Sequence, residues 1–235
     1  MTASPSPSPQ PLSGPVEDYL KAIYDLELVG APASTNDIAD RLAISPASVS
    51  GMVRRLADQG LITHEPYRGV RLTGEGRRAA LRTLRRHRIL ECYLTEVLAY
   101  PWDRVHAEAE RLEHAASDEL VERMADALGN PMMDPHGAPI PTRDGRIEEA
   151  ALHTLAEMAQ GEQVRVRRVN DKEPERLRYL AELGIRPGSL VRILDKAPFE
   201  GPITLWVEDG GGGATRAVGV ALAAQVHVEA ANSDQ

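Results

Sequence analysis

Apolar residues in the first third of the chain recur at helical spacing in three separate segments. The first lies between Val16 and Tyr24 and is ended by a Gly-Ala-Pro sequence at residues 30–32. Ser34 or Thr35 is expected to cap a second helix, and a third is expected to begin at Pro46 and to stop at Gly60. Two short strands follow at residues 61–64 and 70–73, joined by a loop at 66–69. Three helices followed by a hairpin is the order of a winged helix-turn-helix.

The rest of the chain changes from a helical to an alternating pattern. One long helix is expected from Gly74, then helical runs at residues 105–114 and 115–128, then a Gly/Pro-rich connector at 129–141. A short helix is expected at residues 147–158. Alternating runs at residues 163–169, 189–194, 203–207 and 224–228, with a helical insert at 173–183, predict a small antiparallel barrel. The Gly210–Gly213 run does not open a helix and is interpreted as a flexible turn.

Composition narrows the setting. The single cysteine, Cys92, precludes a disulfide within one chain, favours a reducing cytoplasmic location and is interpreted as buried packing. No apolar run approaches the roughly 18 residues that span a bilayer, so no membrane partner is expected. The Ser/Pro-rich start resembles a disordered tail rather than a signal peptide.

The net charge of −8 conceals two oppositely charged blocks. Residues 44–88 carry ten arginines and three acidic residues, a net charge of +7. Residues 91–134 carry eleven acidic residues and three arginines, a net charge of −8. This asymmetry is typical of an anion-binding module joined to a cation-binding module, although arginines on solvated faces would produce it too.

The acidic block contains a strip of metal-ligand side chains. On a continuous helix, His106, Glu110, Glu113 and His114 would lie within about 100° of arc. Two imidazoles and two carboxylates suit a metal ion, but one helix cannot surround a cation. His87 and Glu91, spaced i, i+4 on the preceding helix, are the expected second source of ligands.

Several motifs, in this order and spacing, resemble the diphtheria-toxin-repressor family of metal-dependent transcription regulators, specifically its manganese branch. They are residues 16–20, 47–50, 67–73, 86–88 with Glu91, the strip from His106 to His114, 135–137 and 139–141. The fold implied is mainly α with β: a winged helix-turn-helix, a helical dimerisation domain and a C-terminal SH3-like (FeoA-like) barrel. The expected division is a disordered tail at 1–14, then domains at 15–78, 79–142 and 152–230, with a linker at 143–151.

The resemblance also implies two metal sites. The primary site is assigned to Asp18, Glu110, Glu113 and His114, and the ancillary site to His87, Glu91 and His106, with Glu173 from the C-terminal domain. Arg176 stands where some iron-type relatives use a glutamine, and Lys21 where short two-metal manganese regulators use a glutamate. Arg176 cannot bind a metal ion, and with Lys21 the two-metal cluster of the short regulators is not expected here. His136, in the connector, is interpreted as a loop-packing residue.

Metal preference follows from two of these positions. Iron-type relatives carry cysteine in place of Glu110 and methionine in place of Asp18. Oxygen and imidazole donors suit Mn²⁺, so Mn²⁺ is the expected cofactor, with Fe²⁺ possible and other divalent transition metals accepted in vitro.

The candidates for DNA contact lie at the start of the third helix and on nearby arginines: Ser45, Pro46, Ala47, Ser48, Ser50, Arg54, Arg55, Arg68 and Arg71. Because most of the helix residues are small, and Gly51 stands where relatives carry a glutamine, phosphate contacts and DNA shape should contribute more than direct base readout.

The sequence therefore predicts a homodimeric, manganese-dependent repressor of metal-uptake genes that binds a double-stranded DNA operator and has no small-molecule substrate. An iron-responsive member of the same family, or a winged-helix regulator that senses a non-metal ligand, is the alternative. An enzyme is not expected, because the chain has no HExxH motif or nucleophile elbow.

Overall fold

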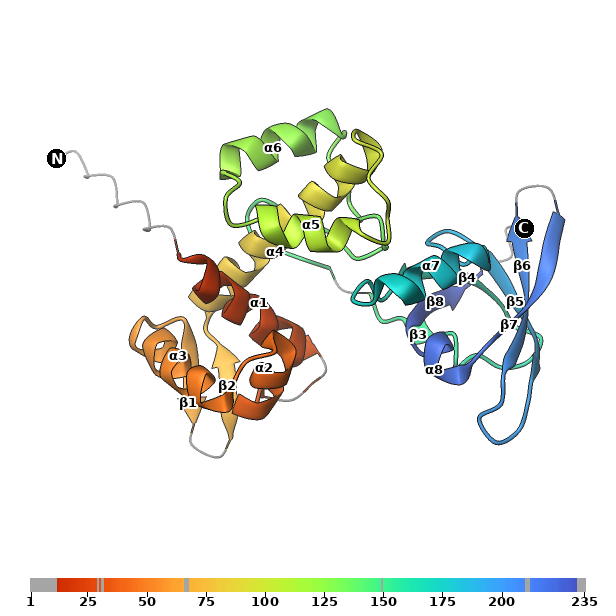
Figure 1. Cartoon of the computed structure of the whole chain (residues 1–235), viewed down its shortest axis with the longest axis horizontal. Coiled ribbons are helices and arrows are strands. Elements are labelled where there is room, and N and C mark those ends of the chain that lie inside the picture. Colours follow the sequence, from red (N-terminus) through yellow and green to blue (C-terminus); the bar gives the residue numbers. More distant parts are fainter. Residues whose placement is uncertain are drawn as a thin grey trace. The chain divides into compact units, whose positions relative to one another are not determined.

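The computed structural model describes residues 12–28, 30, 32–65, 68–148, 150–209 and 212–231, without the side chains of Glu65 and Asp209. The chain forms two compact units, and their division falls within a long helix (Figure 1). The first unit extends to Leu84 and includes residues 143–146; the second contains residues 85–142 and the chain from Ile147 onward. The expected tail as far as residue 11, and Tyr67 of the hairpin loop, lie outside the described residues.

The first unit has the predicted order of three helices and a hairpin. Helices α1 (Gly14–Leu28), α2 (Thr35–Leu42) and α3 (Pro46–Asp58) precede strands β1 (Ile62–Glu65) and β2 (Gly69–Leu72), and α4 (Gly74–Glu96) follows. The strands pair antiparallel, from Ile62 with Leu72 to Glu65 with Gly69. The expected winged helix-turn-helix is confirmed.

Local capping explains where α2 and α3 begin. The Ser34 side chain accepts a hydrogen bond from the Asp37 amide, and the Asp37 side chain accepts one from the Ser34 amide. Ser45 accepts from the Ser48 amide in the same way, with Pro46 in the first turn of α3. These caps define the turn that separates α2 from α3.

The second unit contains the rest of α4, then α5 (Val105–Leu112) and α6 (Asp118–Ala127). The expectation that helix continues through residue 114 and resumes at once is wrong. The chain turns at residues 113–117, and Ser117 caps α6 by accepting from the Leu120 amide. Glu113 still donates its amide to the Ala109 carbonyl, whereas His114 lies beyond the helical bonding of α5.

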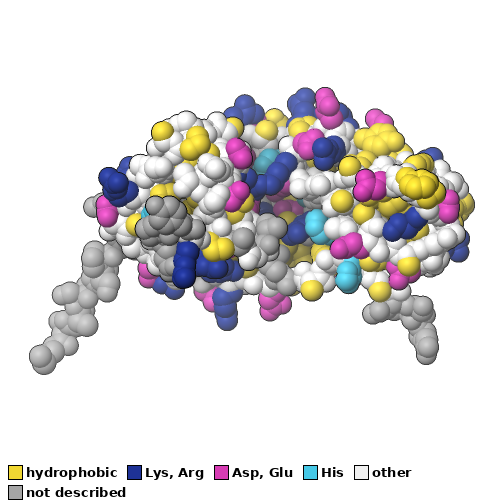
Figure 2. Space-filling view, turned by 90° about the horizontal axis from the view of Figure 1, so that it is seen from below, with side chains coloured by type: hydrophobic (Ala, Val, Ile, Leu, Met, Phe, Trp, Pro, Cys, Tyr) yellow, Lys and Arg dark blue, Asp and Glu magenta, His cyan; other side chains and the backbone are white. Residues whose placement is uncertain are grey.

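Arginines from α4 hold the connector that follows α6. The Arg85 guanidinium pairs with both carboxylate oxygens of Glu122 at 2.8 and 3.0 Å and donates to the Pro141 carbonyl. Arg88 pairs with Asp134 and donates to the Pro139 carbonyl. This part of the basic block therefore has a structural role. On the face seen in Figure 2, basic and acidic side chains are intermixed.

A six-stranded antiparallel sheet forms the C-terminal part, in the order β3-β8-β4-β5-β6-β7. Its elements are β3 (His153–Thr154), β4 (Gln163–Val169), α7 (Pro174–Glu182), β5 (Leu190–Lys196), β6 (Ile203–Asp209), β7 (Gly212–Val218), α8 (Val220–Ala223) and β8 (Val226–Ala230). Its alternating apolar residues form one buried core that includes Leu155, Leu177 and Ile193. None of the described helices is long and apolar enough to cross a membrane.

Two expectations for this part are wrong. Described residues between 147 and 158 form no helix: β3 pairs with β8, and the Leu155 amide bonds the Val226 carbonyl. Burial of Leu155 overrides the helical pattern of the segment. Gly212 and Gly213 lie in β7 rather than in a flexible turn, and Gly210 and Gly211 are outside the described residues. A Cβ on Gly213 would lie 2.6 Å from the Trp206 ring, so the strand needs glycine there.

The role of Leu155 gives a stability test. Leu155→Ala should destabilise the protein by about 2–5 kcal/mol, because it leaves a cavity in the sheet core. Phe199→Ala, at a fully exposed position of the same domain, should change stability by less than about 0.5 kcal/mol. Urea unfolding followed by circular dichroism measures both. Equal effects would mean that Leu155 is not a core residue.

Candidate metal centre

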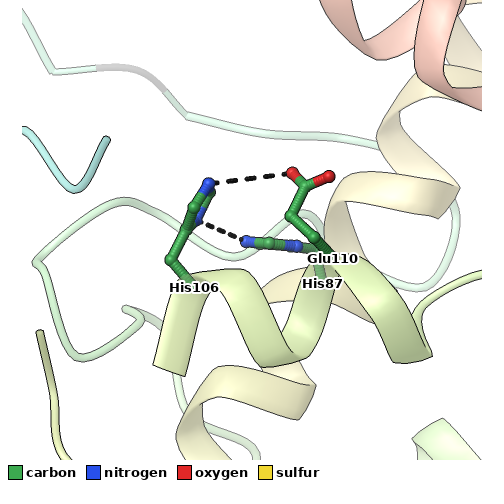
Figure 3. A group of neighbouring side chains, drawn as sticks. All are labelled: His87, His106 and Glu110. Atoms are coloured by element: carbon green, nitrogen blue, oxygen red, sulfur yellow. Dashed lines mark hydrogen bonds and ion pairs between the residues drawn. The ribbon is translucent and has the colours of Figure 1, made fainter. Parts of the chain in front are cut away.

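Three predicted ligands meet between α4 and α5. His87 comes from α4, and His106 and Glu110 come from α5 with their side chains turned toward one another (Figure 3). His87 Nε2 lies 3.0 Å from His106 Nδ1, and His106 Nε2 lies 3.7 Å from Glu110 Oε1. The two imidazole rings meet edge to face, with centroids 4.7 Å apart. The spacing of i, i+4 on each helix places Glu91 beside His87 and Glu110 beside His106.

His87 is held so that one ring nitrogen faces the cluster. Its Nδ1 lies 2.5 Å from Glu113 Oε2, and because an ionised carboxylate only accepts, Nδ1 is the donor. Nε2 lies 3.0 Å from Glu91 Oε1, to which it donates in the charged ring; once deprotonated, the same nitrogen would offer its lone pair to a metal ion. A carboxylate that orients an imidazole in this way is the usual support for a histidine metal ligand.

The C-terminal domain contributes Asp171. Its Oδ2 lies 3.4 Å from His106 Nδ1, and Glu91 Oε1 lies 3.2 Å from the same nitrogen. The resemblance pointed instead to Glu173, which precedes α7 without a side-chain capping bond and pairs with Arg176 at 2.8 Å. The arginine that replaces a glutamine of some relatives thus engages Glu173, whereas Asp171 approaches the histidines.

The buried carboxylates and imidazoles of the cluster shift one another's pKa values. Burial raises the pKa of Glu91, but the charge on His87 and hydrogen bonds from His106 and His87 outweigh burial and lower it. Burial lowers the pKa of His106, while hydrogen bonds to Asp171 and Glu91 raise it to about 10. A proton on His106 therefore balances the carboxylates near neutral pH. A metal ion bound at His106 must displace that proton, so its affinity should rise with pH.

His136 faces the same cluster. Its Nε2 donates to the Trp102 carbonyl at 2.8 Å, which leaves the lone pair of the neutral ring on Nδ1. Nδ1 lies 3.9 Å from Glu91 Oε1 and 4.0 Å from Asp171 Oδ2. Among the described buried side chains, His136 Nδ1 and Glu91 Oε2 are atoms without a hydrogen-bond partner. Such atoms are costly when buried, and a cation would satisfy both.

Asp134 completes the buried group. It is 6% exposed, and burial together with the negative charge of Glu91 raises its pKa. Glu91, Asp134 and His136 each offer a ligand atom within 4.8 Å of the others, and so do Glu91, His106 and Asp171. Carboxylates and imidazoles at these separations fit a divalent cation, whose ligands lie about 2.0–2.2 Å from the metal. The burial of His136 and its bond to Trp102 agree with the interpretation as a loop-packing residue, and its Nδ1 in addition faces Glu91 and Asp134. Its only sequence signal was an imidazole between prolines of the connector.

Among the residues expected at the primary site, Glu113 and His114 lie together, and Glu110 turns to a different histidine. Glu113 is fully buried, and its second oxygen, Oε1, lies 3.7 Å from His114 Nε2. Glu110 turns toward His106 instead, with its side chain 39% exposed. Asp18 is half-buried on α1, in the first unit. Because the two oxygens of Glu113 face His87 and His114, this one carboxylate joins ligands expected at two different sites.

The predicted DNA-contact residues are all exposed in the first unit. They lie at the start of α3 (Ser45, Pro46, Ala47, Ser48 and Ser50), further along it (Arg54 and Arg55) and on the hairpin (Arg68 and Arg71). Ser50 donates its hydroxyl to the Pro46 carbonyl, so that donor is already engaged within the helix. Thr63, Arg68 and Arg71 are among the residues that line a pocket on the hairpin, so two arginines border it.

Comparison with known proteins identifies these parts. Residues 11–70 match the model of the iron dependent repressor N-terminal DNA binding domain. Residues 73–142 match that family's metal binding and dimerisation domain, and residues 153–230 match the FeoA domain. The diphtheria toxin repressor of Corynebacterium jeikeium is 34% identical over 201 residues, which cover 76% of this chain and 84% of that protein.

The chain belongs to the diphtheria toxin repressor family. It is a metal-dependent, DNA-binding transcriptional repressor of that family. The iron-dependent repressor IdeR of Mycobacterium leprae is 38% identical over 157 residues, covering 64% of this chain and 68% of IdeR. A solved structure of a manganese-dependent transcriptional repressor in complex with manganese is 40% identical, with a TM-score of 0.84 over 92% of this chain and all of that one.

The geometry around His106 distinguishes Asp171 from Glu173. Asp171→Ala should weaken Mn²⁺ binding at the His106 site by about 10-fold or more, because it removes a carboxylate that faces the cluster. Glu173→Ala, two residues away, should leave that affinity unchanged. Titration calorimetry of the full-length protein with Mn²⁺ measures both. If Glu173→Ala proved the more damaging variant, the ligand assigned from the resemblance would be the correct one.

Proposed function

We propose that this repressor responds to manganese. The observation that carries the proposal is the donor set: the clustered side chains of the second unit offer only carboxylate oxygens and imidazole nitrogens. Such donors suit Mn²⁺ and give no advantage to softer ions. Cys92 is buried, donates its thiol to the Met133 carbonyl and has a pKa raised by burial, so it is a poor source of thiolate.

Two sites are proposed. The primary site combines Asp18 with Glu110, Glu113 and His114. The second site combines His87, Glu91 and His106 with Asp171 and His136, which take the place expected for Glu173. The second assignment is supported by the 3.0–3.4 Å separations around His106 and by the two buried atoms without hydrogen bonds.

The proposed switch restricts how the DNA-binding domain moves. Asp18 belongs to the first unit, and the other primary ligands belong to the second. A metal held by both would limit the relative orientation of the two units. In a homodimer, the two α3 helices could then enter successive major grooves about 34 Å apart. Without metal, few molecules would adopt that spacing, and the apparent DNA affinity would fall in proportion.

An iron-responsive repressor is the second candidate. The similar proteins from M. leprae and C. jeikeium carry the names iron-dependent repressor and diphtheria toxin repressor. Affinity rises from Mn²⁺ to Fe²⁺ at almost any site, so binding strength alone does not separate the two metals. The difference should lie in how strongly each metal activates DNA binding.

DNA binding should require a divalent metal and should weaken steeply with salt. The arginines of α3 and the hairpin are exposed and contact phosphates in the proposed complex, so binding releases counterions. Duplexes selected from a random pool with Mn²⁺ serve as the probe, and fluorescence anisotropy with and without chelator is the measurement. Equal affinity under both conditions would refute the metal switch, and His114→Ala should reproduce the effect of the chelator.

Metal preference should change when the hard donors are replaced. We expect Mn²⁺ to activate the natural protein at least as strongly as Fe²⁺, and Glu110→Cys with Asp18→Met to shift activation toward Fe²⁺ and Co²⁺. Glu108→Cys is the control, because Glu108 lies on the same helix and pairs with Arg111. Anaerobic anisotropy titrations give the order of the metals. An unchanged order in the double variant would contradict the donor-set argument.

A further inference from the structure

Trp102 lies where the helical part of the second unit meets the C-terminal domain. It belongs to the segment between α4 and α5, and its ring stacks on His136 with centroids 5.3 Å apart and planes 27° from parallel. The Arg186 guanidinium lies over the same ring, 4.8 Å from its centroid. Trp102 also packs against the hydrophobic core of the sheet. The indole is therefore held between the connector and the C-terminal domain.

An ion pair lies next to this stack. Asp103, the residue after Trp102, accepts a hydrogen bond from Arg178 of α7 at 2.9 Å. The Asp103 side chain is only 12% exposed, so water screens the pair less than it screens a surface ion pair. Two arginines of the C-terminal domain thus engage two consecutive residues of the helical part.

The third contact is made by backbone. Gly137 has a φ of +87°, and a Cβ at this position would lie 1.8 Å from the Arg167 carbonyl oxygen of β4. Beside it, the Val169 amide donates to the His136 carbonyl at 2.9 Å. A side chain on Gly137 therefore cannot be accommodated unless the connector and β4 move apart.

We propose that these contacts form a latch, made of Trp102 with Arg186, Asp103 with Arg178, and Gly137 with β4, whose function is to position ligands of the second metal site. His136 stacks on Trp102, and Asp171 lies two residues beyond Val169. The latch therefore holds the segment that carries Asp171 against the connector that carries His136. The latch residues act as positioning residues. The proposal rests on the proposed second site.

The test uses the full-length protein with Trp206→Phe, which leaves Trp102 as its only indole. Gly137→Ala is the test variant, and Gly129→Ala is the matched control. Gly129 also has a positive φ, +74°, but a Cβ there would meet nothing within 4 Å. Both variants therefore carry a similar backbone cost, and only Gly137→Ala forces the contact with β4 apart.

In metal-free protein, Gly137→Ala should shift the Trp102 emission to longer wavelength and increase its quenching by acrylamide, while Gly129→Ala should do neither. In Mn²⁺ titrations, Gly137→Ala should weaken the second site by about 10- to 100-fold and leave the first unchanged, as is typical when support around a ligand is lost. Arg186→Gln should change both measurements in the same direction, whereas Arg176→Ala, which breaks only the exposed pair with Glu173 and adds no ligand group, should change neither.

Unchanged emission in Gly137→Ala would overturn the latch. Changed emission with an unchanged second site would overturn its role in positioning ligands. If both glycine variants failed to fold, Arg186→Gln would decide the question instead. Arg186 is exposed, so this substitution should not prevent folding. A natural protein that binds one Mn²⁺ per chain would instead refute the proposed second site, and the metal-free fluorescence would show whether the domains are latched.

Discussion

The arrangement of the second unit depends on one carboxylate that is shielded from bulk solvent. Glu91 is completely buried, and an ionised carboxylate in that position requires positive charge and hydrogen bonds around it. His87 and His106 approach it from two helices, and His136 approaches from the connector. Hydrogen bonds to Asp171 and Glu91 raise the pKa of His106 despite its burial, so its imidazolium contributes to the balancing charge. A divalent cation would balance the same carboxylates with a larger charge.

The charge balance around Glu91 also involves the C-terminal domain. Asp171 adds a second carboxylate to the histidines, and the charge and hydrogen bond of His106 lower its pKa despite burial. The position of that domain and the charge state of the cluster are therefore coupled. Glu113 adds a second link, since its two oxygens face His87 and His114. Ligands expected at two sites thus share one carboxylate.

Patterns with a short range in the chain were predicted well. The cap at Ser34, the hairpin and the i, i+4 pairs depend on neighbours within a few residues. The segment at 147–158 and strand β7 were missed because distant residues determine them. Leu155 joins a core built from five strands and helix α7, and Gly213 makes room for Trp206 of the adjacent strand. Helical propensity favoured a helix at 147–158, and the low hydrophobicity of the glycine run favoured a turn at 210–213.

By itself, the sequence determined the family, the order of the domains and most of the side chains with metal-ligand chemistry, because these depend on residue type and spacing. The tertiary structure decided which of those side chains meet. It turned Glu110 toward His106 and buried Glu113 against His87. It also brought Asp171, rather than Glu173, to the histidines. The physical reason is that a turn of the chain and the docking of another domain place these atoms, and neither leaves a periodic pattern in the sequence.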